Sequence, residues 1–307
     1  MPFYLAIDAG GTKADYALVD DSAILARVRS GTIKRMRADE ETAGRNLDEA
    51  LRELVTRSGI DLRSVVRTCV GTAGETVPLV TDWLRKEISA RVGGELLLLG
   101  DVEIALDAAF PGRPGILVLA GTGSNVAGRT PQGQIFTAGG WGPALADQGS
   151  GNRIGHEALR AAFLAIDGGV ETSLIPDILR FWSLDSVSDL VAFANGTPSP
   201  DFSQLVRLVM NSAEQGDAVA QSVLKQQGWE LAQLVILLAR RMQKHLNDRN
   251  FTPPLAFAGS ILDKVGLVRS SLVQTVQEFY PGMAAMAGVI DPIEGAIWRA
   301  RGAELTS

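Results

Sequence analysis

The sequence predicts an α/β fold of two lobes, and three observations lead to that prediction. Short apolar runs alternate with segments of helical hydrophobic periodicity, which is the pattern of α/β proteins. A strand, a Gly-Thr turn and a second strand begin the chain, and the same pattern starts again at Gly115. The chain has 307 residues, about twice the common domain size. An internal duplication, with one copy of the core in each lobe, agrees with all three.

The first lobe is expected over residues 1–114. Two apolar runs flank the sequence Asp-Ala-Gly-Gly-Thr-Lys at positions 8–13, which predicts a hairpin with a glycine-rich turn. Helix and strand patterns then alternate along the rest of the lobe. We expect a helix over 42–58, a strand over 65–70, a helix around 80–88 and a strand over 95–99.

The second lobe is expected over residues 115–291, with a strand over 115–120 that enters the sequence Gly-Thr-Gly-Ser-Asn. A strand over 255–258 leads into Gly259-Ser260, and a last helix, 292–307, is expected to pack back on the first lobe. Between them lies a predicted helical insertion. Its helical segments are expected at 154–166, 173–181, 187–194, 202–213 and 218–245.

Composition excludes several classes of function. The net charge is -6, and the basic residues are scattered, so no nucleic-acid partner is expected. No segment has the length and apolarity of a membrane span. Cys69 is the one cysteine, which fits a reducing cytoplasm and excludes a site that needs several thiolates from one chain. A small diffusible substrate is the expected partner.

Two glycine loops have the chemistry of phosphate-binding sites. In the first, Gly10, Gly11, Thr12 and Lys13 offer backbone amides, a hydroxyl and an ammonium to an anion. In the second, Thr122 belongs to a run with the same character. Each loop taken alone is also compatible with a plain hairpin turn. Two such loops together favour binding of a polyphosphate.

Asp101 follows an apolar strand directly, at the edge of the sheet where α/β active sites assemble. A carboxylate at that place can act as a general base, although Asp is also a common helix N-cap. Phosphoryl transfer needs magnesium beside the phosphates, and Asp8 is the candidate ligand. Gly259 and Ser260 could bring backbone close to an adenine or ribose, or form a tight turn only.

A second polar cluster surrounds one tryptophan. Gly140, Trp141 and Asp147 lie in a run rich in glycine that precedes a helix. A sugar ring could stack on Trp141 and hydrogen-bond to Asp147. The alternative is a buried tryptophan and an aspartate that caps the helix.

These motifs, in order, resemble the BadF/BadG/BcrA/BcrD ATPase family and its N-acetylglucosamine kinase branch, which belongs to the actin-like ATPase superfamily. The resemblance spans nearly the whole chain and includes Asp-Pro-Ile-Glu-Gly-Ala at 291–296. It implies two ribonuclease H-like lobes around an ATP cleft, with ATP and Mg²⁺ as cofactors and a homodimeric assembly. It also implies that Asp101 is the catalytic base and that Gly259-Ser260 lies near adenosine. The residues implied on the sugar or phosphate side are Asp101, Thr122, Ser124, Asn125, Gly140, Trp141 and Asp147.

The chain departs from this branch in the segment 30–37, Ser-Gly-Thr-Ile-Lys-Arg-Met-Arg. The acetylglucosamine kinases have an Asn-containing loop that touches the sugar here, and this chain has no Asn in the segment. Lys34, Arg35 and Arg37 could instead meet an acidic or phosphorylated substrate, or form a solvated basic loop.

The predicted function is therefore an ATP-dependent kinase that phosphorylates a hydroxyl of an amino sugar, with N-acetylglucosamine as the first candidate. Glucosamine is the alternative, because Asp-Gln-Gly-Ser-Gly at 147–151 resembles the glucosamine kinases. Family members that activate other enzymes through an iron-sulfur cluster take two thiolates from each chain, and a single cysteine excludes that role. A regulatory ATPase without sugar kinase activity is the other alternative.

Overall fold

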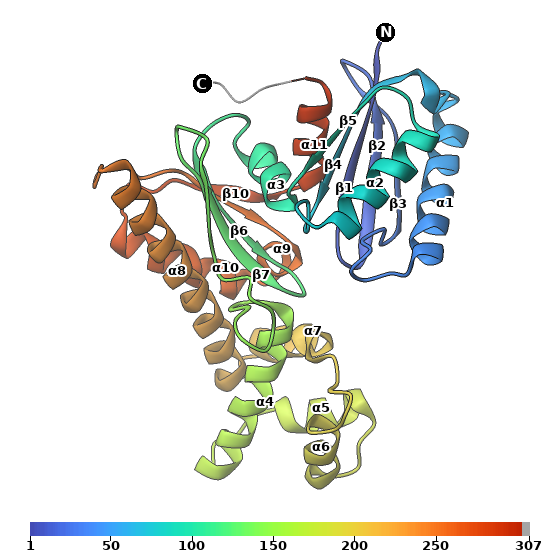
Figure 1. The fold of residues 1–307 in the computed structure, drawn as a ribbon. Helices are drawn as coiled ribbons and strands as arrows, with labels where there is room; N and C mark the ends of the chain where they lie inside the picture. The colour runs from blue at the N-terminus through green and yellow to red at the C-terminus, as the bar shows by residue number, and fades with distance from the viewer. Residues whose placement is uncertain (303–307) are drawn as a thin grey trace. The chain divides into compact units, whose positions relative to one another are not determined.

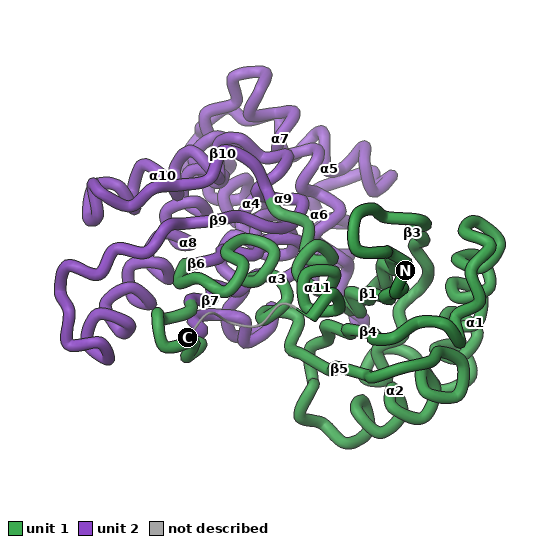
Figure 2. The backbone as a smooth tube through the Cα atoms, turned by 90° about the horizontal axis from the view of Figure 1, so that it is seen from above, with its two compact units in different colours: residues 1–115, 129–135, 290–307 green, residues 116–128, 136–289 purple. Residues whose placement is uncertain are grey.

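The computed structural model describes residues 1–302, and the chain forms two compact units (Figures 1 and 2). Unit 1 consists of residues 1–115, 129–135 and the segment from Ile290 onward. Unit 2 consists of residues 116–128 and 136–289. The first five-stranded sheet lies in unit 1 and the second is built mainly from unit 2. Helices accompany both sheets, so the predicted α/β class is confirmed.

The sheet of unit 1 has the strand order β3-β2-β1-β4-β5. β1 is antiparallel to β2 and parallel to β4. This register places Asp8 of β1 opposite Asp15 of β2, and it places the ends of β1, β4 and β5 along one edge of the sheet. The strands are β1 (Phe3–Ala9), β2 (Lys13–Val19), β3 (Ile24–Gly31), β4 (Val65–Thr72) and β5 (Glu95–Leu99).

Helices α1 and α2 supply apolar side chains to one core of unit 1, and α3 and α11 supply them to a second core. The ends of α1 follow from local chemistry: Asp39 accepts a hydrogen bond from the amide of Thr42, and Gly59 takes the left-handed conformation. A short 3₁₀ helix, Leu62–Ser64, leads into β4. The helices are α1 (Glu40–Ser58), α2 (Pro78–Arg91), α3 (Asp101–Ala109) and α11 (Pro292–Ala300).

The last helix packs on α3 and β1 of unit 1. Gly295 makes the close approach to α3 possible, because a Cβ atom at this position would lie 1.8 Å from the carbonyl oxygen of Ile104. The helix ends at Ala300. Residues 303–307, the last part of the helix predicted over 292–307, lie outside the described residues.

The second sheet has the order β10-β9-β6-β7-β8. This is the arrangement of the first sheet: three strands consecutive in the chain lie side by side, and two later strands add beside the first of them. A duplicated core has this property. The strands are β6 (Gly115–Ala120), β7 (Ser124–Arg129), β8 (Ile135–Ala138), β9 (Leu255–Ala258) and β10 (Ala285–Ile290).

Helices make up most of the rest of unit 2, as Figure 1 shows. Their apolar faces form one large core with β6, β7 and β9. Within residues 1–302 no helix has the length and apolarity to cross a membrane. The helices are α4 (Gly151–Gly168), α5 (Leu174–Trp182), α6 (Val187–Ala194), a 3₁₀ turn (Phe202–Leu205), α7 (Val206–Glu214), α8 (Ala218–Leu246), α9 (Ser260–Lys264) and α10 (Gly266–Phe279).

Candidate active site

Asp101 is the first residue of α3 and lies just after the end of β5. The N-cap of α3 is Gly100, so the alternative of Asp101 as a simple cap is wrong. The Asp101 carboxylate accepts a hydrogen bond of 2.8 Å from the amide of Val102. Burial raises the pKa of Asp101, while the Val102 amide and the positive charge of Lys34 oppose the rise. A carboxyl with a raised pKa is a better proton acceptor than an ordinary aspartate.

Asp8 lies among other acids. Burial raises its pKa to about 7, and the charges of Asp101, Asp15 and Asp291 add to the rise. Asp15 is paired with Arg29 at 2.9 Å, and Asp291 with Arg27 at 2.7 Å. Asp8 has no ion pair within the described residues. A cation bound beside Asp8 would relieve this excess of negative charge.

The first glycine loop, residues 10–12, joins β1 to β2 in unit 1. Thr32 donates a hydrogen bond of 2.7 Å to the carbonyl oxygen of Gly10, which fixes the base of the loop. Gly11 and Thr12 are exposed, and a Cβ atom at Gly11 would meet nothing within 4 Å. Lys13 is exposed beside them at the start of β2. The predicted phosphate loop is thus open to a ligand.

In unit 2 the second glycine loop and the tryptophan loop are joined. The Ser124 hydroxyl donates a hydrogen bond of 2.7 Å to the carbonyl of Gln148, and the Gly151 amide donates one of 2.7 Å to the carbonyl of Gly121. A Cβ atom at Gly140 would lie 3.1 Å from the Asn125 side chain. The structure therefore brings together the residues that the sequence placed in two separate motifs.

Asp147 is buried and adopts a left-handed backbone conformation, with φ of 65°. This conformation is uncommon outside glycine and often occurs at functional sites. Its carboxylate accepts a hydrogen bond of 3.2 Å from the Gly142 amide, and burial raises its pKa. Ser150 caps α4, so the alternative of Asp147 as a helix cap is wrong.

Two further features of these loops concern a ligand. Trp141 is 75% exposed, so the alternative of a buried tryptophan is also wrong. The side-chain oxygens of Asn125 and Gln148 are buried, and neither has a hydrogen-bond donor within the described residues. Buried acceptors without a donor are rare in proteins, and a bound molecule with hydroxyl groups could satisfy them.

A cavity of about 440 Å³ in unit 2 is lined by two of the residues predicted to bind the nucleotide, Thr122 and Ser260. Gly259 has φ of 93°, and a Cβ atom there would lie 2.3 Å from the carbonyl of Ala120, so only glycine fits. The lining also includes residues that the sequence motifs missed, because they lie outside those motifs, on the 3₁₀ turn Phe202–Leu205, on α7 and at the end of α9. These are Ser203, Gln204, Val206, Arg207, Met210 and Lys264.

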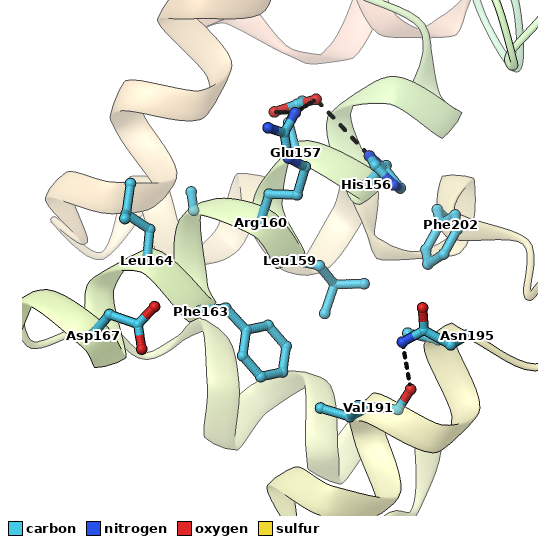
Figure 3. A pocket seen from close by; sticks show the side chains of 12 residues that line it. His156, Glu157, Leu159, Arg160, Phe163, Leu164, Asp167, Val191, Asn195 and Phe202 are labelled. Atoms are coloured by element: carbon cyan, nitrogen blue, oxygen red, sulfur yellow. Dashed lines mark hydrogen bonds and ion pairs between the residues drawn. The ribbon is translucent and has the colours of Figure 1, made fainter.

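A larger cavity, of about 690 Å³, lies between α4 and α6 in unit 2 (Figure 3). Figure 3 shows Glu157 beside His156, and Asn195 hydrogen-bonded to the carbonyl of Val191 at 2.8 Å. None of the predicted site residues lines it. We therefore do not assign the active site to this cavity, although it is larger than the cavity with Thr122 and Ser260.

Residues 1–302 contain no group of three or more His, Cys, Asp or Glu side chains arranged to hold a metal ion. Cys69 is buried, and burial raises the pKa of its thiol to about 12. The thiol is therefore protonated at neutral pH and is a poor metal ligand.

Comparison with known proteins relates the whole chain to one family and to proteins named as sugar kinases. The chain is 30% identical to the N-acetylmuramic acid/N-acetylglucosamine kinase of Clostridium acetobutylicum, over 98% of this chain and 99% of that protein. It is 26% identical to the N-acetyl-D-glucosamine kinase of Dictyostelium discoideum, over 95% and 96% of the two chains.

The fold is also that of a solved structure from Porphyromonas gingivalis, described as a candidate N-acetylglucosamine kinase. The TM-score is 0.75 at 19% identity, over 98% of this chain and 99% of the other. The BadF/BadG/BcrA/BcrD ATPase family matches residues 5–302. The chain is therefore a member of the BadF/BadG/BcrA/BcrD ATPase family, with the actin-like ATPase fold.

Proposed function

We propose that this protein is an ATP-dependent kinase that transfers the γ-phosphoryl group to a hydroxyl of an amino sugar, with N-acetylglucosamine as the first candidate. The observation that carries the proposal is Asp101, a half-buried carboxylate just after the end of β5, whose pKa is raised. The names of the two relatives, both kinases of N-acetylated sugars, support the class of substrate.

In this proposal Asp101 accepts the proton of the attacking sugar hydroxyl. Gly10, Gly11, Thr12 and Lys13 bind phosphate oxygens through exposed backbone amides and an ammonium. The cavity with Thr122 and Ser260 in unit 2 takes the adenosine of ATP. These roles suit phosphoryl transfer, because that reaction depends on the positioning of its reactants and on neutralisation of the charge on the phosphates.

Magnesium fits Asp8. Mg²⁺ in kinases is held by one or two carboxylates, by waters and by the phosphates of the nucleotide, so it does not need a site made of three protein side chains. Asp8 forms no ion pair within the described residues, and the acids around it add to the rise of its pKa, which the charge of Lys13 only partly opposes. When bound, the ion neutralises the charge that develops on the phosphates.

The sugar is proposed to contact Ser124, Asn125, Gly140, Trp141 and Asp147. Trp141 offers an exposed aromatic face, and Asn125 offers a buried oxygen without a donor. Glucosamine remains the alternative substrate, since the chain also has the run at 147–151. We further propose a homodimer, as the family resemblance implies, and a location in the reducing cytoplasm, which the single cysteine fits.

The test is release of ADP from Mg-ATP in the presence of N-acetylglucosamine, glucosamine, N-acetylmannosamine or glucose. Strong stimulation by one amino sugar is expected, with phosphorylation of that sugar confirmed by mass spectrometry. Slow hydrolysis of ATP that no sugar changes would overturn the kinase proposal in favour of a regulatory ATPase.

A further inference from the structure

The segment 32–38 connects β3 to α1 and is fixed beside the first glycine loop. Thr32 holds the carbonyl of Gly10 at 2.7 Å, and the Asn46 side chain holds the carbonyl of Thr32 at 2.9 Å. The carbonyl of Lys34 accepts hydrogen bonds from the amides of Arg37 and Ala38, at 2.8 and 3.0 Å. The backbone at Lys34 therefore has a defined position next to the phosphate loop.

The three cations of this segment differ in their surroundings. The Arg35 guanidinium stacks over Trp83, at 5.9 Å from the ring centroid, and lies 3.8 Å from a Glu40 carboxylate. Arg37 is exposed. Lys34 is half-buried, and within residues 1–302 its ammonium has no hydrogen bond and no ion pair. The ammonium is close enough to Asp101 for its charge to act on that carboxyl.

An ammonium that has lost part of its water without gaining a hydrogen-bonded anion is costly. An anionic group of a ligand would satisfy it. If Asp101 accepts the proton of the sugar hydroxyl, as proposed above, a cation beside Asp101 lies beside the sugar. The phosphates of ATP already have proposed binding groups in the first glycine loop and Lys13. An anion that the sugar carries is therefore the first candidate for Lys34.

We propose that Lys34 binds a carboxylate on the sugar, so that this enzyme prefers an amino sugar with an acidic substituent over its neutral counterpart. The inference rests on the proposed kinase function. N-acetylmuramic acid is a suitable probe, because it is N-acetylglucosamine with a lactic acid ether that ends in a carboxylate. The Clostridium acetobutylicum relative is named for both sugars, so the pair is a matched comparison of the acidic and the neutral substrate.

The same ammonium could meet another anionic oxygen, the γ-phosphate of ATP. The two sources of the anion predict different kinetics. Loss of a contact with the sugar carboxylate lowers kcat/KM for the acidic substrate only. Loss of a contact with the phosphate raises the KM for ATP and slows phosphorylation of both sugars to the same extent.

The experiment measures kcat/KM for N-acetylmuramic acid and N-acetylglucosamine in the wild type, Lys34→Met and Lys34→Arg. Lys34→Met is expected to lower the ratio of the two values, acidic over neutral, about 10- to 100-fold, mostly through the KM for the acidic sugar. The ratio cancels any effect through Asp101 that both sugars share. Lys34→Arg retains the charge and is expected to recover most of the ratio. Arg37→Met, which removes an exposed cation of the same segment, is the control and should leave the ratio unchanged.

An unchanged ratio in Lys34→Met would overturn the proposal, and a raised KM for ATP would assign Lys34 to the phosphate. If the wild type phosphorylates neither sugar, the kinase proposal fails by itself. Calorimetric binding of N-acetylmuramic acid then decides on Lys34: weaker binding to Lys34→Met than to the wild type keeps its role, and equal binding removes it.

Discussion

The guanidinium of Arg129 lies 2.7 Å from the carboxylate of Asp107, and both side chains are buried. Arg299 of α11 reaches the other oxygen of the same carboxylate at 2.6 Å. Asp107 thus holds the end of β7 and the last helix against α3, the helix that begins with Asp101.

Replacement of Asp107 by Ala is expected to lower the free energy of unfolding by about 3 to 5 kcal/mol, because Arg129 would stay buried without a counter-charge. Urea unfolding followed by circular dichroism measures the loss. Glu53→Gln, which breaks an exposed ion pair with Arg57, is the control and should cost less than about 1 kcal/mol. A loss of equal size in both variants would contradict the role given to burial.

Asp101→Asn is expected to bind ATP as the wild type does and to lose a factor of about 10² to 10⁴ in kcat, because the amide cannot accept the proton of the sugar hydroxyl. Single-turnover formation of sugar phosphate measures the loss. Since burial raises the pKa of Asp101, wild-type kcat/KM should fall as the pH drops through that raised value. Near-normal turnover by Asp101→Asn would exclude Asp101 as the base.

Asp8→Asn should change stability in a way that depends on pH. The pKa of Asp8 is about 7 in the folded protein against 3.8 for an ordinary aspartate, so the folded state retains a proton that the unfolded state releases. Its contribution to stability is full below about pH 4 and is lost as the pH rises through 7. The variant should therefore match the wild type at pH 4 and exceed it by about 1 to 3 kcal/mol at pH 8.

Thermal unfolding without nucleotide, at both pH values, makes this comparison. A variant that is equally destabilised at pH 4 and pH 8 would show that the charge of Asp8 has little effect on stability. The same variant should need more Mg²⁺ for half-maximal activity, if Asp8 helps to hold the ion.

Ser260→Trp is expected to raise the KM for ATP at least about 10-fold while the KM for the sugar stays the same, because the indole would fill the cavity proposed for adenosine. Ser260 is exposed, so the core should tolerate the change. Asp263→Trp puts the same ring at an exposed position of α9 outside the lining of the cavity and serves as control. Equal effects of the two variants would place adenosine elsewhere.

Trp141→Ala should raise the KM for the sugar about 10-fold or more and leave the melting temperature unchanged, because an indole that is 75% exposed adds little to the core. Leu145, 82% exposed in the same loop, gives the matched control Leu145→Ala. A drop in melting temperature without a change in KM would assign Trp141 a structural role instead.

The sequence by itself determined the α/β class, the two glycine loops and the bounds of several helices. The helix predicted over 187–194 is α6, and the one predicted over 218–245 is α8 within one residue at its end. Hydrophobic period, caps and glycine turns are local properties, so they can be read along the chain. The strands β3, β8 and β10 were not predicted. All three lie at sheet edges with mixed burial, so they have no continuous apolar run.

Only the tertiary structure decided which side chains meet and in what environment. In the structure Trp141 is exposed, and Gly100 is the N-cap of α3. Arg207 and Lys264 line the same cavity as Ser260. The tertiary structure also brings the charge of Lys34 to bear on Asp101. Strand register and loop packing make these contacts between residues far apart in the chain, and burial then sets their pKa values. No local pattern contains that information, because it arises from the packing of several elements at once.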